Sequence, residues 1–370
     1  MKRAYIFVDN LKIGGYQRLS LDQAYALSDL DYIVTMIVLS PRLEWTAAII
    51  EKEQLELKKI ELLESKNSRV VLLKLFYKLF PSSQSHNLFI SHSLRATFVL
   101  RLVNIITRRN LSINTTLHQL PRLSHLTQRI KRFIYAQFTS QLYCFSKAAE
   151  IGWYRQFGVK FEGVLSRYTK PIKTLRNGIY LDRLPEKHLM GHDQSKPRII
   201  YLGRLSFWKG LDTIKKLASS EELSEFDFVL MVPAITAQDF QELKTILGER
   251  LTVIEGKSVA SFQSQSRDVH IYPANYGKEV EFIESISLNC LEMCAIGVPS
   301  VVTSGGLVTW PELLETGLVK QVNWLNIGEV ANAIKLSQNI ALSPVELSKV
   351  RALVDINRQI ENLLERGSLN

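Results

Sequence analysis

Short runs of β-branched, aliphatic and aromatic residues recur along the chain, and helix-like segments follow them. These runs cover residues 4–10, 32–40, 87–93, 113–119, 226–233, 250–256 and 268–275. Continuous apolar runs of this length are typical of parallel strands that are buried on both faces, and their alternation with helices is the βαβ pattern. The sequence therefore predicts an α/β chain with parallel sheets. One of the intervening helices is expected over the charged residues 46–64.

Charge divides the chain into two halves. Residues 1–176 contain 27 Lys and Arg against 12 Asp and Glu, a net charge of +15, whereas residues 177–370 contain 19 against 24, a net charge of −5. A chain of 370 residues is long enough for two domains. We therefore predict an N-terminal domain over residues 1–177 and a C-terminal domain over residues 178–349. The basic half is expected to bind a polyanion, either an anionic membrane surface or nucleic acid.

Three basic segments in the first half, 69–80, 95–110 and 127–138, combine Lys and Arg with Leu, Phe and Tyr. Such helices can lie on an anionic membrane, but their apolar faces can equally cover the sheet while the basic side chains stay in water. Both interpretations stay open. No uncharged stretch reaches the roughly 18 residues of a spanning helix, and no nucleic-acid motif is recognisable. We expect a cytoplasmic protein, either free or peripheral on the inner face of the plasma membrane.

Two glycines and two histidines in the first half are candidate site residues. Gly14 and Gly15 follow the first apolar run, where glycine lets the backbone turn sharply and approach a ligand. His92 and His118 lie near strand ends, where open α/β sheets hold ligands. A single histidine at such a place is also compatible with a packed, hydrogen-bonded residue.

The cysteines are too few and too irregularly spaced for a disulfide framework or a zinc site: Cys144, Cys290 and Cys294. Cys290 and Cys294 are four residues apart on one expected helix, and we interpret them as small buried side chains. The sequence therefore predicts neither a metal ion nor a cofactor.

Residues 197–218 read as a strand, a turn and a helix, and the turn contains two cations. Arg204 and Lys209 lie between the strand end and the helix start, with Gly203 and Gly210 beside them. Cations at a helix N-terminus are unfavourable unless an anion is bound there. Because both side chains can converge on an anion beside the positive helix end, the turn predicts a diphosphate clamp.

The stretch 271–306 reads as a strand, a long loop, a buried helix and a further strand. Either Ser285 or Ser287 is expected to cap this helix, which is apolar on nearly every face. Glu292 within it needs a partner, because an unpaired buried carboxylate is costly. If the segment were helical throughout, Glu284 and Glu292 would lie about 12 Å apart, too far for an acid and a base that act on one glycosidic bond. The spacing fits two ends of an extended ligand.

Several motifs in the second half resemble the C-terminal domain of retaining GT-B glycosyltransferases of the family-4 type. The matching residues are LGRLSFWKGLD, the E-x7-E pattern in ESISLNCLE, the following MCAIGVPSVVTSGG, and Asn177-Gly178; GGYQR and TTLHQ resemble the family's first loop and active-site histidine. The resemblance implies two Rossmann-like domains that face a cleft. It also implies that the last helix, expected over 343–365, returns to the first domain over about residues 350–370. Ser-Ile-Ser follows Glu284 where the family more usually has Gly-Phe-Gly, so the donor sugar stays open.

The resemblance assigns roles on the donor side of the site. Arg204 and Lys209 would hold the donor diphosphate and stabilise the charge that develops as it leaves. Glu284 would bind sugar hydroxyls, and Glu292 would accept hydrogen bonds from the ribose, which would supply the partner that it needs. The donor would also touch Gly203 and the backbone amides that follow Glu284: Ser285, Ile286, Ser287 and Leu288.

The resemblance assigns further roles in the first half. Gly14 and Gly15 would let the first loop approach the phosphates and the sugar. His118 would contact the sugar on its reacting face, and Asn177 would lie at the hinge between the domains. In such enzymes, retention is generally ascribed to attack on the face from which the phosphate leaves, without a protein nucleophile and without a metal.

The resemblance therefore implies a retaining, metal-independent hexosyltransferase. Its donor would be a nucleotide-sugar, which we expect to be UDP-linked, and its acceptor a saccharide, which we expect to be lipid-linked, in bacterial surface polysaccharide biosynthesis. Two alternatives stay open. One is a nucleotide-sugar epimerase on the same scaffold, and the other is a non-catalytic partner subunit associated with the membrane.

Overall fold

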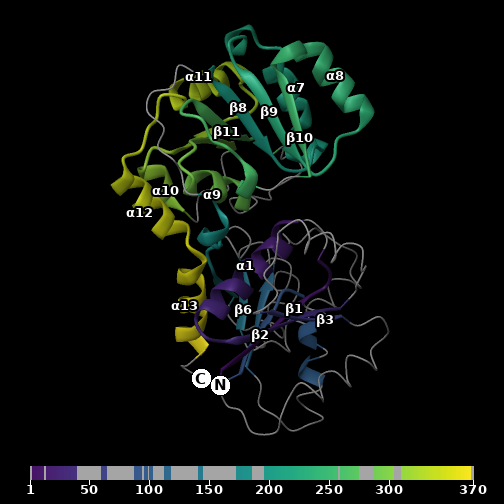
Figure 1. Cartoon of the computed structure of the whole chain (residues 1–370), viewed down its shortest axis with the longest axis vertical. Helices are drawn as coiled ribbons and strands as arrows, with labels where there is room; N and C mark the ends of the chain where they lie inside the picture. Colours follow the sequence, from purple (N-terminus) through teal and green to yellow (C-terminus); the bar gives the residue numbers. More distant parts are fainter. Residues whose placement is uncertain are drawn as a thin grey trace, which may run out of the picture. The chain divides into compact units, whose positions relative to one another are not determined.

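The computed structural model describes residues 2–11, 14–39, 60–64, 87–93, 96–98, 100–102, 112–117, 141–144, 172–185, 196–256, 259–274, 287–303 and 310–367. The chain divides into two compact units. Unit 1 comprises Met1–Tyr180 together with Ile356–Asn370, and unit 2 comprises Leu181–Asp355. Figure 1 shows that each unit is built around a sheet of its own.

Within the described residues, unit 1 contains a seven-stranded sheet with the order β3-β2-β1-β4-β5-β6-β7, and all its strands are parallel. Its strands are β1 (Arg3–Val8), β2 (Ile33–Val38), β3 (Ile60–Glu64), β4 (Asn87–Ser91), β5 (Ile113–Leu117), β6 (Gln141–Cys144) and β7 (Ile172–Thr174). Central strands such as β5 are buried along their whole length, as a parallel sheet that is covered on both faces requires.

Two helices from opposite ends of the sequence pack together in unit 1. α1 (Gly15–Asp29) follows β1, and α13 (Ile356–Gly367) returns to contact it, as Figure 1 shows for the purple and yellow helices. Gln359 of α13 accepts a hydrogen bond from Gln23 Nε2 of α1 at 3.0 Å and donates to the carbonyl of Arg176 at 2.9 Å. The predicted return of the last helix to the first domain is therefore confirmed.

The described part of unit 2 contains a six-stranded parallel sheet with the order β10-β9-β8-β11-β12-β13. Its strands are β8 (Arg198–Leu202), β9 (Asp227–Val232), β10 (Leu251–Glu255), β11 (Asp268–Tyr272), β12 (Ser300–Thr303) and β13 (Val319–Val322). Its α-helices are α7 (Leu211–Ala218), α8 (Ala237–Leu247), α9 (Leu288–Ala295), α10 (Pro311–Glu315), α11 (Ile327–Ser337) and α12 (Pro344–Val354). Short 3-10 helices are η2 (Leu181–Arg183), η3 (Phe207–Lys209), η4 (Glu221–Leu223), η5 (Gly248–Arg250) and η6 (Val259–Ser261).

Helices cover both faces of the unit 2 sheet. Right-handed crossovers run in opposite directions on the two sides of β8, so α7 and α8 cover one face and α9 the other. α11 packs against α7, and α12 packs against α9. Alternate residues of β8 separate the two layers: Ile199 and Tyr201 belong to the core shared with α7, α8 and α11. The α/β architecture with parallel sheets, predicted from the apolar runs, is confirmed in both units.

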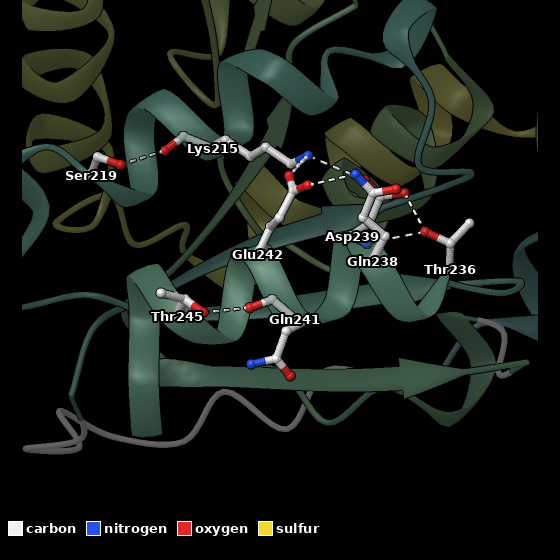
Figure 2. A network of polar contacts seen from close by, with 8 residues as sticks. All are labelled: Lys215, Ser219, Thr236, Gln238, Asp239, Gln241, Glu242 and Thr245. Carbon is white, nitrogen blue, oxygen red and sulfur yellow. Dashed lines mark hydrogen bonds and ion pairs between the residues drawn. The ribbon is translucent and has the colours of Figure 1, made fainter.

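A polar network joins the outer surfaces of α7 and α8, and Figure 2 shows it from close by. Lys215 of α7 donates to Asp239 at 3.1 Å and to Glu242 at 2.5 Å, both on α8. Thr236 caps α8 and accepts a hydrogen bond from the Asp239 backbone at 3.1 Å. Because these groups remain solvated, the network adds only a small amount to stability.

Two secondary-structure predictions are wrong. Residues 60–64, expected at the end of a charged helix, form β3, because pairing with β2 outweighs the helix propensity of Leu and Glu. The single helix expected over 343–365 is two helices, α12 and α13, with an extended Asp355 between them (ψ 130°). The Ile356 amide donates to the Ile179 carbonyl at 2.9 Å instead of continuing α12. No helix within the described residues is long and apolar enough to cross a membrane.

Candidate functional site

The unit 2 sheet reverses its strand order between β8 and β11. β8 pairs with β9 on one side and with β11 on the other, so the chain winds outward in both directions from this point. Open α/β sheets bind ligands beyond the carboxyl ends of their strands at such a switch point. The turn that carries Arg204 and Lys209 follows the carboxyl end of β8, which places it at this position.

Glycine is required in the turn after β8. Gly210 ends η3 and precedes α7 with φ +81°, a left-handed conformation. A Cβ on Gly210 would lie 1.9 Å from the carbonyl oxygen of Pro273, which directly follows β11. Gly203 has φ +142°, and a Cβ there would approach Asn289 Nδ2 to 3.3 Å. The turn therefore packs its backbone directly against the end of β11 and the start of α9.

Two tyrosines from neighbouring strands hold the cationic turn. Lys209 is half-buried, and its Nζ donates to the Tyr272 hydroxyl at 2.7 Å while lying 5.1 Å from the centre of that ring. Tyr201 donates to the carbonyl of Arg204 at 2.7 Å, and the Arg204 side chain is exposed. Burial raises the pKa of Tyr201, and the nearby charge of Arg204 opposes that rise. The Tyr201 phenol therefore stays protonated at neutral pH and can donate this hydrogen bond.

The N-terminus of α9 lies at the same edge of the sheet. Ser287 caps the helix and accepts a hydrogen bond from the Asn289 amide at 3.3 Å, which settles the choice between Ser285 and Ser287. The Asn289 side chain donates to the carbonyl of Leu202, the last residue of β8, at 2.6 Å. This contact brings the first turn of α9, and with it Leu288, beside the turn that carries the two cations. Positive charge from a helix end and from side chains thus meets at one edge.

Glu292 has a partner within the protein. Its carboxylate accepts a hydrogen bond from Arg183 of η2, and only 7% of the Glu292 side chain and 12% of the Arg183 side chain are exposed. Arg183 thus supplies, within the protein, the partner that was expected from the ribose of a ligand. Removing one partner of an ion pair this deeply buried strongly destabilises the folded protein, because the other charge is left without compensation.

The separation expected between Glu284 and Glu292 also needs correction. It assumed helix from one residue to the other, but α9 begins at Leu288 and Ser287 has an extended backbone (φ −62°, ψ 141°). The separation of about 12 Å, which assumed an unbroken helix through Ser287, therefore does not apply. Glu284, Ser285, Ile286 and His118 themselves lie outside the described residues.

The edge of the unit 1 sheet is arranged differently. Its order also reverses beside the first strand, between β1 and β4. His92, just after β4, bonds through Nε2 to Gln23 Oε1 at 2.8 Å, and burial lowers its pKa to about 3. Ser93 donates to Asp9, which follows β1, at 2.8 Å. Burial and then the Asp9 charge raise the pKa of Tyr16 to about 12. His92 is thus a neutral, packed residue.

Gly14, Gly15 and Asn177 are the other predicted site residues of unit 1 that the structure describes. Gly14 has an extended backbone (φ −179°) that any residue adopts, and a Cβ on Gly15 would meet nothing within 4 Å. The fold alone therefore does not explain this pair. Asn177 is 7% exposed, and its buried Oδ1 accepts no hydrogen bond within the described part of the chain.

The structure adds three residues to the site that the sequence analysis missed. They are Tyr272, Asn289 and Arg183, the partners of Lys209, Leu202 and Glu292. For Arg183 the signal was the partner that a buried Glu292 needs; the other two carry no local signal. Cys290 and Cys294 are buried as predicted, and Cys144 is buried as well. No group of three His, Cys, Asp or Glu side chains in the described ranges could hold a metal ion.

No family model matches this sequence, and no curated protein matches it. Solved structures match it in fold. A glycosyltransferase from Rickettsia africae has a TM-score of 0.67 at 14% identity, with 99% of this chain and 98% of that chain covered. Anabaena Alr3699/HepE in complex with UDP-glucose has a TM-score of 0.65 at 16% identity, with 100% of both chains covered. A Listeria monocytogenes protein assigned as a UDP-N-acetylglucosamine 2-epimerase has a TM-score of 0.54 at 13% identity, with 98% and 95% covered. At these identities the likeness concerns the fold, which is GT-B.

Proposed function

We propose that the chain is a retaining glycosyltransferase of the family-4 type that takes its sugar from a nucleotide-sugar. The observation that carries this proposal is the edge of unit 2, where Arg204, Lys209 and the N-terminus of α9 gather at the strand switch point. This arrangement suits a diphosphate, because it offers two cations and the positive end of a helix in one place. The GT-B fold supports the same class.

The donor is held by charge at one end and by hydroxyl recognition at the other. Arg204 and Lys209 bind the diphosphate and stabilise the negative charge that grows on it as the bond to the sugar breaks. The amides of Ser285, Ile286, Ser287 and Leu288 approach the same phosphates, beside Gly203. Glu292 accepts hydrogen bonds from the ribose hydroxyls, and Glu284 from the sugar.

Unit 1 supplies residues that contact the donor sugar, and it binds the acceptor. Gly14 and Gly15 admit the donor to the first loop, His118 contacts the sugar, and Asn177 belongs to the segment where the units join. The acceptor hydroxyl attacks the anomeric carbon on the face from which the diphosphate departs, and a phosphate oxygen takes its proton. No protein nucleophile or metal is required in this scheme.

The donor that we propose is UDP-linked, because UDP-glucose is the ligand in the Anabaena structure. The acceptor is a lipid-linked saccharide of a bacterial surface polysaccharide, which the net charge of +15 in residues 1–176 supports. Anionic vesicles should then recruit the protein at low salt and release it as the salt rises. An absence of binding at low salt would remove the membrane from the proposal.

The test starts with a screen of nucleotide-sugars for thermal stabilisation, since a ligand of the folded state raises the midpoint. Lys209→Ala and Glu284→Ala should each abolish transfer, or donor hydrolysis where no acceptor is known, and leave the fold intact. Lys216→Ala is the matched control, because Lys216 is exposed on α7 near the same turn. Full activity in folded Lys209→Ala would refute the site.

A second candidate is a nucleotide-sugar epimerase, because the Listeria protein assigned to that activity shares the fold. The two activities leave different products. An epimerase incorporates hydrogen from water at a sugar carbon without any acceptor, whereas a transferase releases the nucleoside diphosphate. After a reaction in heavy water without an acceptor, deuterium in the recovered nucleotide-sugar would favour the epimerase.

A further inference from the structure

Arg183 and Glu292 form an ion pair within unit 2 across a long stretch of sequence. They are 109 residues apart, and Arg183 Nη2 donates to Glu292 Oε1. Both side chains are almost completely buried. Within the described residues, Arg183 is the one partner of this carboxylate. The pair therefore fixes where one of the two carboxylate oxygens points.

The position of Glu292 on α9 links this pair to the candidate nucleotide site. Asn289 precedes Glu292 by three residues, so the two side chains lie on neighbouring parts of one helix face. Asn289 reaches the carbonyl of Leu202 at the end of β8. The face that carries Glu292 is therefore turned toward the edge where the cationic turn lies.

α9 is held at its other end as well. Arg351 of α12 donates to the carbonyl of Ala295, the last residue of α9, at 3.3 Å. A cation at a helix C-terminus satisfies a carbonyl without an intrahelical partner and complements the helix dipole. With Asn289, Arg183 and Arg351 holding it, α9 keeps Glu292 in one place.

A carboxylate accepts hydrogen bonds at about four lone-pair sites, and Arg183 uses one oxygen. We propose that Arg183 is a positioning residue, which orients Glu292 so that its remaining lone pairs accept the 2′- and 3′-hydroxyls of the donor ribose. This inference rests on the proposed function, from which the ribose role of Glu292 comes. It adds a residue at the first turn of unit 2, next to the segment that enters from unit 1.

A purely structural ion pair would neutralise Glu292 without affecting what the carboxylate recognises. The two roles differ in their effect on ribose discrimination. Removing a structural pair lowers stability and weakens all nucleotides equally. Removing a positioning residue weakens the ribonucleotide more than its 2′-deoxy counterpart, because a misplaced carboxylate no longer gains from the hydroxyl.

The experiment measures binding of UDP, ADP and GDP to the full chain by calorimetry and then compares the tightest with its 2′-deoxy form. The wild-type protein should favour the ribonucleotide by about tenfold, as sites that bond a hydroxyl reject the analogue that lacks it. Arg183→Gln and Glu292→Gln should each reduce this ratio to about one, and the double variant should reduce it no further. Arg183→Lys keeps the positive charge, and therefore the fold, but lacks the planar guanidinium group. In this variant the ratio of ribonucleotide affinity to 2′-deoxynucleotide affinity should fall at least about threefold.

Arg198→Gln is the matched control. Arg198 pairs with buried Asp268 at 2.7 and 2.8 Å, at the start of β8 and so at the end of that strand away from the site. This variant should lose thermal stability and keep the wild-type ratio. An unchanged ratio in either folded Arg183 variant, while wild-type protein binds the ribonucleotide, overturns the inference and leaves the proposed function standing. If wild-type protein binds none of the three diphosphates, the proposed function fails, and the inference with it.

Discussion

The two sheets share one order over six strands and differ in what lies at the edge where that order reverses. In unit 2 that edge presents two cations and a helix N-terminus, on a backbone turn that only glycine permits. In unit 1 the described part of the edge holds neutral His92 and an Asp9 that is hydrogen-bonded to Ser93. The same winding of the chain therefore supports two kinds of surface, and side chains, not topology, decide which one suits an anion.

The largest effect should come from Gly210→Ala. The added Cβ would overlap the Pro273 carbonyl at 1.9 Å and force a left-handed residue, so we expect a loss of about 3 kcal/mol or more in the free energy of unfolding. Urea denaturation measures this loss. Gly317→Ala separates the two causes, because Gly317 also has a positive φ (+69°) but nothing within 4 Å; it should cost about 1 kcal/mol. Equal losses would mean that the close approach at Gly210 does not matter.

A smaller effect should appear at the unit 1 edge when the pH falls. The pKa of His92 is lowered to about 3 by burial, whereas an unfolded histidine titrates near about 6.5. Between these values the unfolded chain binds a proton that the folded chain does not. The free energy of unfolding should therefore fall by about 1.4 kcal/mol for each pH unit below about 6.

His92→Asn should remove this contribution, so the stability difference between variant and wild type should shrink as the pH falls from about 6 to about 4. Denaturation curves at a series of pH values test it, and other titrating groups cancel in the difference. A difference that stays constant over this range would show that folded His92 takes up the proton as readily as unfolded His92. The unit 1 edge would then be less closed than its hydrogen bonds indicate.

The smallest effect should come from Tyr272→Phe, which keeps the ring beside Lys209 but removes the oxygen that accepts its hydrogen bond. We expect little change in stability and a loss of about 1 kcal/mol, or about fivefold, in affinity for the nucleoside diphosphate. Calorimetric titration measures it. Tyr25→Phe, on α1 of unit 1, should leave the affinity unchanged. An effect of the same size in both variants would mean that the phenol of Tyr272 does not position the lysine.

Much of the fold could be predicted because parallel strands that are buried on both faces leave continuous apolar runs. The errors arose where distant contacts decide the local structure. β3 contains residues that favour a helix, and pairing with β2 makes it a strand. Nothing in the sequence around Asp355 marks a helix break, since the break depends on a bond from Ile356 to Ile179.

The candidate site shows the same limit. Arg204 and Lys209 could be predicted because they lie within one strand–turn–helix segment. Their surroundings could not: Tyr272 is 63 residues from Lys209, and Asn289 is 87 residues from Leu202. The need of Glu292 for a partner was visible in the sequence, but nothing identified that partner as Arg183. A local pattern shows that a buried charge must be compensated and does not show by which residue.

The return of α13 to unit 1 has a consequence for the order in which the chain can assemble during synthesis. Unit 2 is one continuous segment, so all its described strands and helices have been translated once Asp355 has been added. Unit 1 is completed later, because Gln23 can bond to Gln359 only after 336 more residues have been translated. Until then the face of α1 that receives α13 is uncovered on the nascent chain. The basic half of the protein is thus begun first and completed last.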